Sequence, residues 1–160
     1  MTERTQPLTE ATSASGPLHV RAEMFTIPTD KTMQIVDLTD DVMARVRALG
    51  VREGTATIAS LHTTCSLLVN ESQAALSEDM EQFLRHVVDP ATPWLHNDPE
   101  HSDCERMNAG AHLRALVMSP SVTLHISGGE LVLGRWQRLL MAELDGPRSR
   151  TLRLQVMGVT

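Results

Sequence analysis

The sequence predicts an α+β fold: a compact single domain with a largely antiparallel β-sheet or sandwich and two to three helices. Strand-like and helix-like segments are mixed along the chain, without the regular strand–helix–strand alternation of a parallel sheet. The Gly128-Gly129 pair separates two strand-like runs, as in a β-hairpin. With 160 residues and 41% hydrophobic composition, the chain can bury one core, and its length requires no second domain.

The N-terminal region divides into a tail and a strand pair. Residues 1–17 are rich in Thr, Ser, Glu and Pro, which predicts a flexible tail and leaves residues 18–160 as the domain. His19–Ile27 alternates with the period of two of a strand, and Met33–Leu38 is its expected partner in a first hairpin.

Two helices flank a pair of strands in the next part of the chain. Thr39 is the expected N-cap of a helix that ends at Gly50. Gly54–Leu61 and Ser66–Val69 have strand composition. Ser72 is the expected N-cap of a longer helix, whose inward-facing residues are Leu76, Met80, Phe83, Leu84 and Val87.

The second half begins with a loop and ends in strands. Asp89–Met107 contains three prolines and no periodicity, so we expect a long loop, which is commonly a functional lid or a disordered segment. Asn108–Met118 reads as a short helix that Ser119-Pro120 terminates. The expected strands after it are Val122–Ile126, Leu131–Leu133 and Thr151–Met157.

Composition excludes several classes of partner. The net charge of −6 and pI near 5.6 argue against nucleic acid or an anionic membrane surface, which require a basic stripe, and favour small molecules or protein subunits. Residues at the N-terminus lack the charged and then apolar order expected of a signal peptide, and no apolar run approaches the length of about 20 residues that spans a bilayer. Cys65 and Cys104 are far apart and form no CxxC pair, so we expect a cytoplasmic protein without a disulfide framework.

The segment Leu131–Arg148 is the strongest functional signal. It places Trp136, Gln137, Glu143 and Asp145 on a strand-and-turn stretch. Asp145-Gly146-Pro147 forms a turn that presents Arg148, whose guanidinium suits carboxylate or phosphate. A hairpin with a surface arginine is the alternative. Several arginines could bind an anionic ligand or form a solvated basic face: Arg135, Arg138, Arg148, Arg150 and Arg153.

Seven histidines offer candidate ligands. His62 follows a strand, and His112 lies four residues after Asn108 on the same face of a predicted helix. Together with Glu71 they would form a three-ligand catalytic metal site with an open position. The alternatives are that each histidine is a polar residue at a rim and that Glu71 flanks a helix start. Cys65 could be a nucleophile paired with His62, or buried filler.

Four segments share their order and spacing with one known family. They are HTTCSLLVNES at 62–72, WLHN at 94–97, NAGAHLRALVMSPS at 108–121 and LVLGRWQRLLMAELDGPRSR at 131–150. On these residues the chain, over roughly 20–158, resembles the YjbQ family, also named UPF0047 or secondary thiamine-phosphate synthases. The resemblance implies a compact α+β fold assembled as a homotrimer, with polar residues grouped in a pocket at or near subunit boundaries. Relatives often have Asp or His where this chain has Gly110, so one candidate ligand or acid is absent.

The resemblance also implies an activity and its residues. Family members have been linked to a weak thiamine-phosphate synthase activity, a transferase reaction that joins a pyrimidine pyrophosphate to a thiazole phosphate. Such an enzyme holds two anionic groups and stabilises a departing pyrophosphate, commonly with a divalent ion such as Mg or Zn. The candidate catalytic residues are His62, Glu71, His112 and Arg148, with His62 and His112 as metal ligands. The candidate substrate-binding residues are Thr63, Thr64, Asn70, His96, Asn108, Arg135, Trp136, Gln137, Glu143 and Asp145.

In this hypothesis Arg148 and Gln137 position the anionic group of the substrate, and Trp136 lines the pocket or stacks on a heteroaromatic ring. Two other function classes remain open. A metal-dependent hydrolase or lyase would use the same pocket. A non-catalytic trimer would bind a small anion or a protein partner without turnover.

Overall fold

The fold consists of strands and helices in an α+β arrangement, seen in a computed structural model that describes residues 13–160. Most of the tail expected over 1–17 therefore lies outside the described residues. The elements are β1 His19–Pro28, β2 Gln34–Asp37, α1 Thr39–Leu49, β3 Glu53–Ser60, β4 Cys65–Asn70, α2 Ala74–Val87, the 3-10 turn Leu95–Asn97, α3 Ala109–Leu116, β5 Ser121–Ser127, β6 Glu130–Leu131, β7 Arg138–Glu143 and β8 Ser149–Val159.

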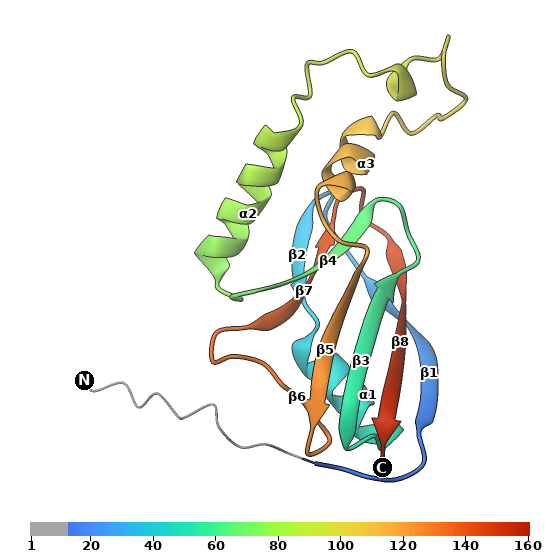
Figure 1. Ribbon diagram of the computed structural model, residues 1–160. Coiled ribbons are helices and arrows are strands. Elements are labelled where there is room, and N and C mark those ends of the chain that lie inside the picture. The colour runs from blue at the N-terminus through green and yellow to red at the C-terminus, as the bar shows by residue number, and fades with distance from the viewer. Residues whose placement is uncertain (1–12) are drawn as a thin grey trace, which may run out of the picture.

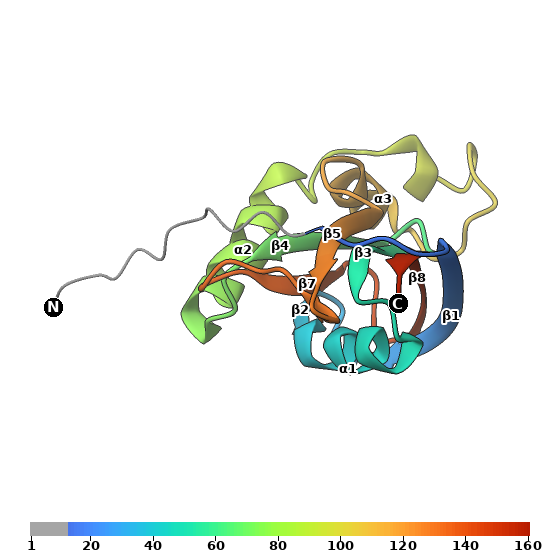
Figure 2. The same cartoon turned by 60° about the horizontal axis from the view of Figure 1, so that its bottom comes forward.

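The strands form two antiparallel sheets (Figures 1 and 2). One sheet has five strands in the order β1-β8-β3-β5-β6, and the other has three in the order β2-β7-β4. The expected α+β class with antiparallel sheets is confirmed. The expected first hairpin is wrong, because β1 pairs with β8 and β2 pairs with β7, in different sheets. Period-two alternation identifies a strand but does not identify its partner.

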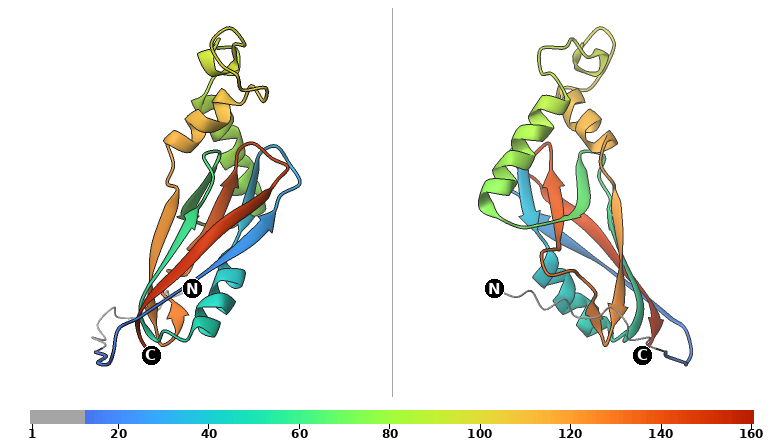
Figure 3. Two further views of the ribbon diagram at one scale, coloured as in Figure 1. Left: turned by 90° about the vertical axis from the view of Figure 1, so that its right-hand side faces the viewer. Right: turned by 60° about the vertical axis from the view of Figure 1, so that its left-hand side comes forward.

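The three-stranded sheet lies between two layers of side chains. One face packs against the five-stranded sheet and α1 in the main core, which includes Leu67, Met141, Leu154 and Val46. Its other face packs against α2 and α3 in a second cluster around Ala142 and Leu84. Both faces of β7 are thus buried, so β7 is rich in consecutive apolar residues. Figure 3 shows α2 and α3 at one end of the molecule and α1 towards the other.

The first helix begins differently from the expectation. Thr39 was the expected N-cap, but it is the first helical residue, and its hydroxyl accepts the backbone N–H of Leu139 at 2.9 Å. Leu38 is the N-cap and makes no side-chain cap hydrogen bond, while the carboxylate of Asp37, the residue before it, accepts the Thr39 N–H at 2.9 Å. Gly50 ends the helix in the left-handed conformation, φ 71°, as expected.

The second helix is buried on a narrower face than its apolar pattern suggests. Gln73, not Ser72, caps it by accepting a backbone N–H of the first turn at 2.7 Å. Leu84 is buried, but Phe83 is 65% exposed and Val87 is 38% exposed. The expectation that all five apolar residues face inward is therefore wrong for this pair in the isolated chain.

Two turns depend on glycine. Gly128 and Gly129 have positive φ, 61° and 86°, and join β5 to β6 in the predicted hairpin. At Gly146, a Cβ atom would lie 2.2 Å from the carbonyl oxygen of Lys31, which leaves no room for a side chain. Among the described residues, none of the helices combines the length and apolarity required to cross a membrane.

Candidate functional site

Strand alternation brings an acid and a base together between the sheets. On β7, Glu143 lies on the face that carries Met141, and on β8, Arg150 lies on the face that carries Leu152 and Leu154. These two faces meet in the main core, so the two charged side chains meet where the apolar core ends. Both are buried, with Glu143 0% and Arg150 1% exposed.

The Glu143 carboxylate and the Arg150 guanidinium are joined by two hydrogen bonds. The Arg150 guanidinium donates to both carboxylate oxygens, from Nε to Oε2 at 2.6 Å and from Nη2 to Oε1. The carboxylate also accepts the Thr29 hydroxyl at 3.0 Å and the Asp145 N–H at 2.8 Å. Arg150 Nη2 also donates to Thr64, to its carbonyl at 3.2 Å and its hydroxyl at 3.1 Å. Burial alone raises the pKa of Glu143, but the hydrogen bonds from Arg150 and Asp145 outweigh it and lower that pKa.

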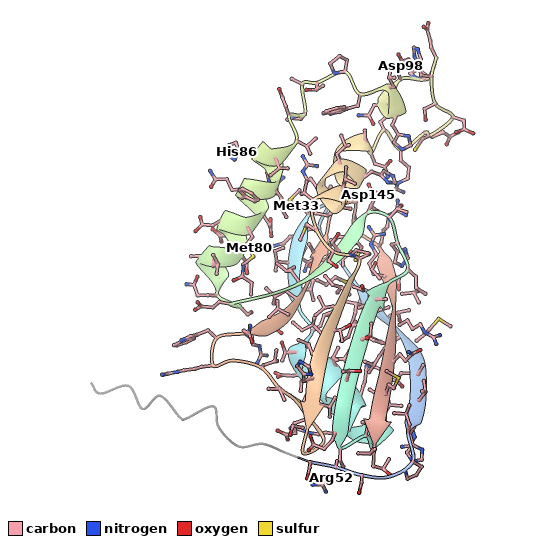
Figure 4. All side chains as sticks on the ribbon, viewed as in Figure 1. Met33, Arg52, Met80, His86, Asp98 and Asp145 are labelled. Atoms are coloured by element: carbon pink, nitrogen blue, oxygen red, sulfur yellow. The ribbon has the colours of Figure 1, made fainter. Side chains whose placement is uncertain are left out.

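Asp145 is the centre of a second cluster, beside α3 in Figure 4. Its Oδ2 atom accepts from Arg148 Nη2 at 2.7 Å, Arg106 Nε at 3.2 Å and Asn108 Nδ2 at 2.9 Å. Burial raises the pKa of Asp145, but these hydrogen bonds and the charges of Arg148 and Arg106 bring it below its ordinary value. Because one carboxylate is shared by two guanidiniums, the cluster carries excess positive charge.

His62 is held in a neutral form close to both clusters. Its Nε2 accepts the backbone N–H of Thr151 at 2.8 Å, so the neutral ring carries its proton on Nδ1. Burial lowers the pKa of His62, and the charges of Arg150 and Arg148 lower it further, while Glu143 opposes them.

The residues that follow His62 lie in different environments. Thr63 is exposed in the turn between β3 and β4, whereas Thr64 is buried and bonded to Arg150. Cys65 is 1% exposed, and burial raises the pKa of its thiol, which disfavours the nucleophilic thiolate. The buried-filler alternative for Cys65 is thus the better description.

His112, on α3, contacts His96 of the 3-10 turn Leu95–Asn97. Their rings contact edge to face with centroids 5.1 Å apart. Burial lowers the pKa of His112, and the charge of His96 lowers it further against the opposing effect of Asp145. The two imidazoles line a cavity of about 330 Å³ whose other walls are mainly apolar, with Trp94 and Leu113 among them.

The remaining predicted residues lie at the other end of the three-stranded sheet. The register pairs Cys65 with Glu143 and Asn70 with Arg138, so β4 separates its two ends by about 16 Å at about 3.3 Å per residue. Glu71 follows Asn70 at this far end, and a cavity there is lined by Arg135 and Gln137 together with residues of α1. Trp136 is 62% exposed, and Arg135 stacks on its ring with 4.8 Å from Cζ to the centroid.

The predicted three-ligand set is therefore not formed within one chain. Glu71 is at the opposite end of β4 from His62. His62 already accepts a hydrogen bond on Nε2 and faces two arginines, an environment that disfavours a cation. Among residues 13–160, no three His, Cys, Asp or Glu side chains are grouped as metal ligands. This donor set does not fit a divalent ion.

Three residues of the site were missed as site residues by the sequence reasoning. Arg150 was placed only in a general arginine cluster, yet its alternation with Leu152 and Leu154 marks it as inward-facing. Thr29 and Arg106 carry no such signal, because they reach the site from a turn and from the long loop.

Comparison with known proteins identifies the family. The profile described as UPF0047 protein YjbQ-like matches residues 23–159. A UPF0047 protein of Methanothermobacter thermautotrophicus is 31% identical over 141 residues, covering 88% of this chain and 94% of that protein. One from Archaeoglobus fulgidus is 36% identical over 126 residues, covering 79% and 93%.

Comparison with solved structures supports the same family. A YbjQ-like protein of unknown function from Sulfolobus solfataricus superposes with a TM-score of 0.81 at 29% identity, covering 89% of this chain and 99% of that chain. A hypothetical protein from Aeropyrum pernix gives 0.78 at 36% identity, covering 86% and 98%. The match over nearly the whole domain, in sequence and in fold, shows that the chain belongs to the UPF0047, or YjbQ-like, family.

Proposed function

We propose that this chain is a homotrimeric, cytoplasmic transferase that acts on phosphorylated small molecules and forms thiamine phosphate weakly. The observation that carries the proposal is the Asp145 cluster. Arg148 and Arg106 share one carboxylate, so this end of the sheet has positive charge in excess, next to the neutral imidazoles of His62 and His112. Anion binding beside neutral hydrogen-bonding groups suits the departure of an anionic leaving group.

The proposed reaction needs this combination. The thiazole ring nitrogen forms a bond to the methylene carbon of the pyrimidine, and the carbon–oxygen bond to pyrophosphate breaks, with its electron pair leaving on oxygen. Negative charge grows on that oxygen, so guanidinium donors lower the barrier. Neutral His62, with its proton on Nδ1, is a hydrogen-bond donor for the leaving oxygen, whereas the fully buried Glu143 positions Arg150, which in turn bonds to Thr64, and does not contact substrate.

A homotrimer would complete the pocket. The positions that match the family occur at both ends of β4, and a neighbouring subunit can bring its Glu71, Trp136 and Gln137 end to the His62 end. Exposed apolar side chains are available for such an interface: Phe83 at 65% and Leu116 at 78% exposure. Light scattering of the purified chain tests this, with an expected mass three times 17.6 kDa.

The test of the reaction uses the two thiamine precursors and follows pyrophosphate and thiamine phosphate together. The wild-type chain should form product above a His62→Ala control. His86→Ala is the matched control, since His86 is an exposed histidine on α2, away from the Asp145 cluster (Figure 4). Equal rates for wild type and His62→Ala would refute the role of His62.

A non-catalytic anion binder is the second candidate. The Arg148 guanidinium donates two hydrogen bonds to Asp145 in its own turn, from Nε to the carbonyl and from Nη2 to Oδ2, which favours this function, because a guanidinium held in one orientation suits recognition as well as catalysis. Saturable binding of both precursors with no product at any enzyme concentration would favour this function over the transferase.

A further inference from the structure

Near the Asp145 cluster lies a further guanidinium, that of Arg114, which has no acidic partner among residues 13–160. Arg114, on α3, donates from Nε to the carbonyl of Leu84 at 2.6 Å and from Nη2 to that of Val88 at 3.4 Å. These carbonyls are at the C-terminal end of α2, so Arg114 caps that helix. Its Nη1 has no hydrogen bond to residues 13–160, and Arg114 forms no salt bridge in that range.

This guanidinium lines a cavity of about 360 Å³, within the usual range of roughly 300–1,000 Å³ for small-molecule sites. The cavity is also lined by Arg106, Asn97 and Asn108. Asp145 is the only carboxylate among its lining residues, and its Oδ2 already accepts three donors. The lining therefore has more positive than negative charge.

Gly110 keeps the guanidinium accessible. A Cβ atom at this position would lie 3.0 Å from Arg114 Nη1 and 3.6 Å from Cζ. A side chain here would thus cover the free face of the guanidinium, and glycine leaves it open. Burial lowers the pKa of Arg114, and the nearby charge of Arg85 lowers it further, as expected for a cation that lacks a counter-charge.

We propose that the cavity between α3 and the Asp145 turn binds a phosphate group, with Arg114 Nη1 as its main donor and Arg106 as a second charge. The proposal rests on the proposed function only in that the phosphate would belong to a phosphorylated substrate. Phosphate binding itself requires no turnover.

The most informative variant places a carboxylate next to the Arg114 guanidinium. In Gly110→Asp, the carboxylate lies beside Arg114 and competes with phosphate, while the cap on α2 is retained. Gly110→Asn is the matched control, with the same shape and no charge. Both substitutions replace a helical glycine early in α3, where Asp and Asn are tolerated. An Arg114→Gln variant is less informative because it also removes the helix cap.

The purified protein, in the oligomeric state in which it is obtained, is titrated with sodium phosphate in a calorimeter. A titration with sodium chloride at equal ionic strength is the reference. We expect saturable phosphate binding by wild type, weakened at least about tenfold in Gly110→Asp and within about threefold in Gly110→Asn. Absence of saturable binding by wild type, or equal weakening in both variants, would overturn the proposal.

The condensation assay separates this proposal from the proposed function. If phosphate binds as expected but no thiamine phosphate forms, the reaction fails and the subsite stands. If wild type and Gly110→Asp form product equally well at limiting substrate, the subsite fails and the reaction stands.

Discussion

The buried pair of Glu143 and Arg150 predicts an unequal response to the loss of either partner. Glu143→Gln preserves the shape and the acceptor for the Asp145 N–H but leaves the Arg150 charge unpaired. An arginine does not neutralise itself by losing its proton, so we expect a loss of about 3–5 kcal/mol in the free energy of unfolding. This loss should be the same at about pH 5 and about pH 7.

Arg150→Met leaves an acid that can neutralise itself. In the unfolded chain the carboxyl titrates near its ordinary value of 4.5, whereas the unpaired, buried Glu143 would stay protonated. This variant should therefore lose a further 1.4 kcal/mol or so for each pH unit above that value, about 2.7 kcal/mol between pH 5 and pH 7.

The assay is urea unfolding followed by circular dichroism, at one fixed protomer concentration because an oligomer's stability depends on it. The double variant Glu143→Gln with Arg150→Met removes both charges, so its loss should be smaller than the sum of the single losses by at least about 2 kcal/mol. Single losses under about 1 kcal/mol, or additive losses, would refute the reasoning that this pair joins the two sheets.

Three further outcomes are expected. Gly146→Ala should destabilise the chain by about 1–3 kcal/mol, because its Cβ would lie 2.2 Å from the Lys31 carbonyl; unchanged urea midpoints would contradict this. Because the native pKa of His62 is below 6.5, the unfolded chain binds more protons there, so stability should fall as pH decreases through 6.5, and His62→Gln should reduce that fall; an identical pH profile would argue against it. Phe83→Ser should shift the assembly towards monomer in light scattering if its 65% exposed ring is an interface contact, and an unchanged mass at low concentration would exclude that contact.

Local chemistry made much of the fold predictable. Gly50 and the Gly128-Gly129 pair appear where positive φ is required, and the helices begin within a few residues of the expected positions. Strand partners were not predictable, because β1 and β8 lie more than a hundred residues apart and alternation specifies a face and no neighbour. The exposed Phe83 was missed because a periodic stripe records which residues are apolar and does not record which surface covers them.

The candidate site was also predictable only in part, because sequence indicates local geometry better than it indicates which distant segments meet. Asn108, Asp145 and Arg148 were singled out and do meet, since a turn and a helix start impose their own geometry. The grouping of Glu71 with His62 failed within one chain because a short strand separates them by its whole length. Arg106 comes from an irregular loop, where spacing carries no information about position.

The central claim is that the end of the sheet carrying Asp145 binds the anionic part of the substrate. A crystal structure of the assembled protein with pyrophosphate tests it most directly. We predict pyrophosphate within hydrogen-bond distance of Arg114 or Arg106, beside α3 and His112. Pyrophosphate bound only at the far end of β4, against Arg135 and Gln137 with no contact from a neighbouring subunit's Asp145 end, would contradict the claim.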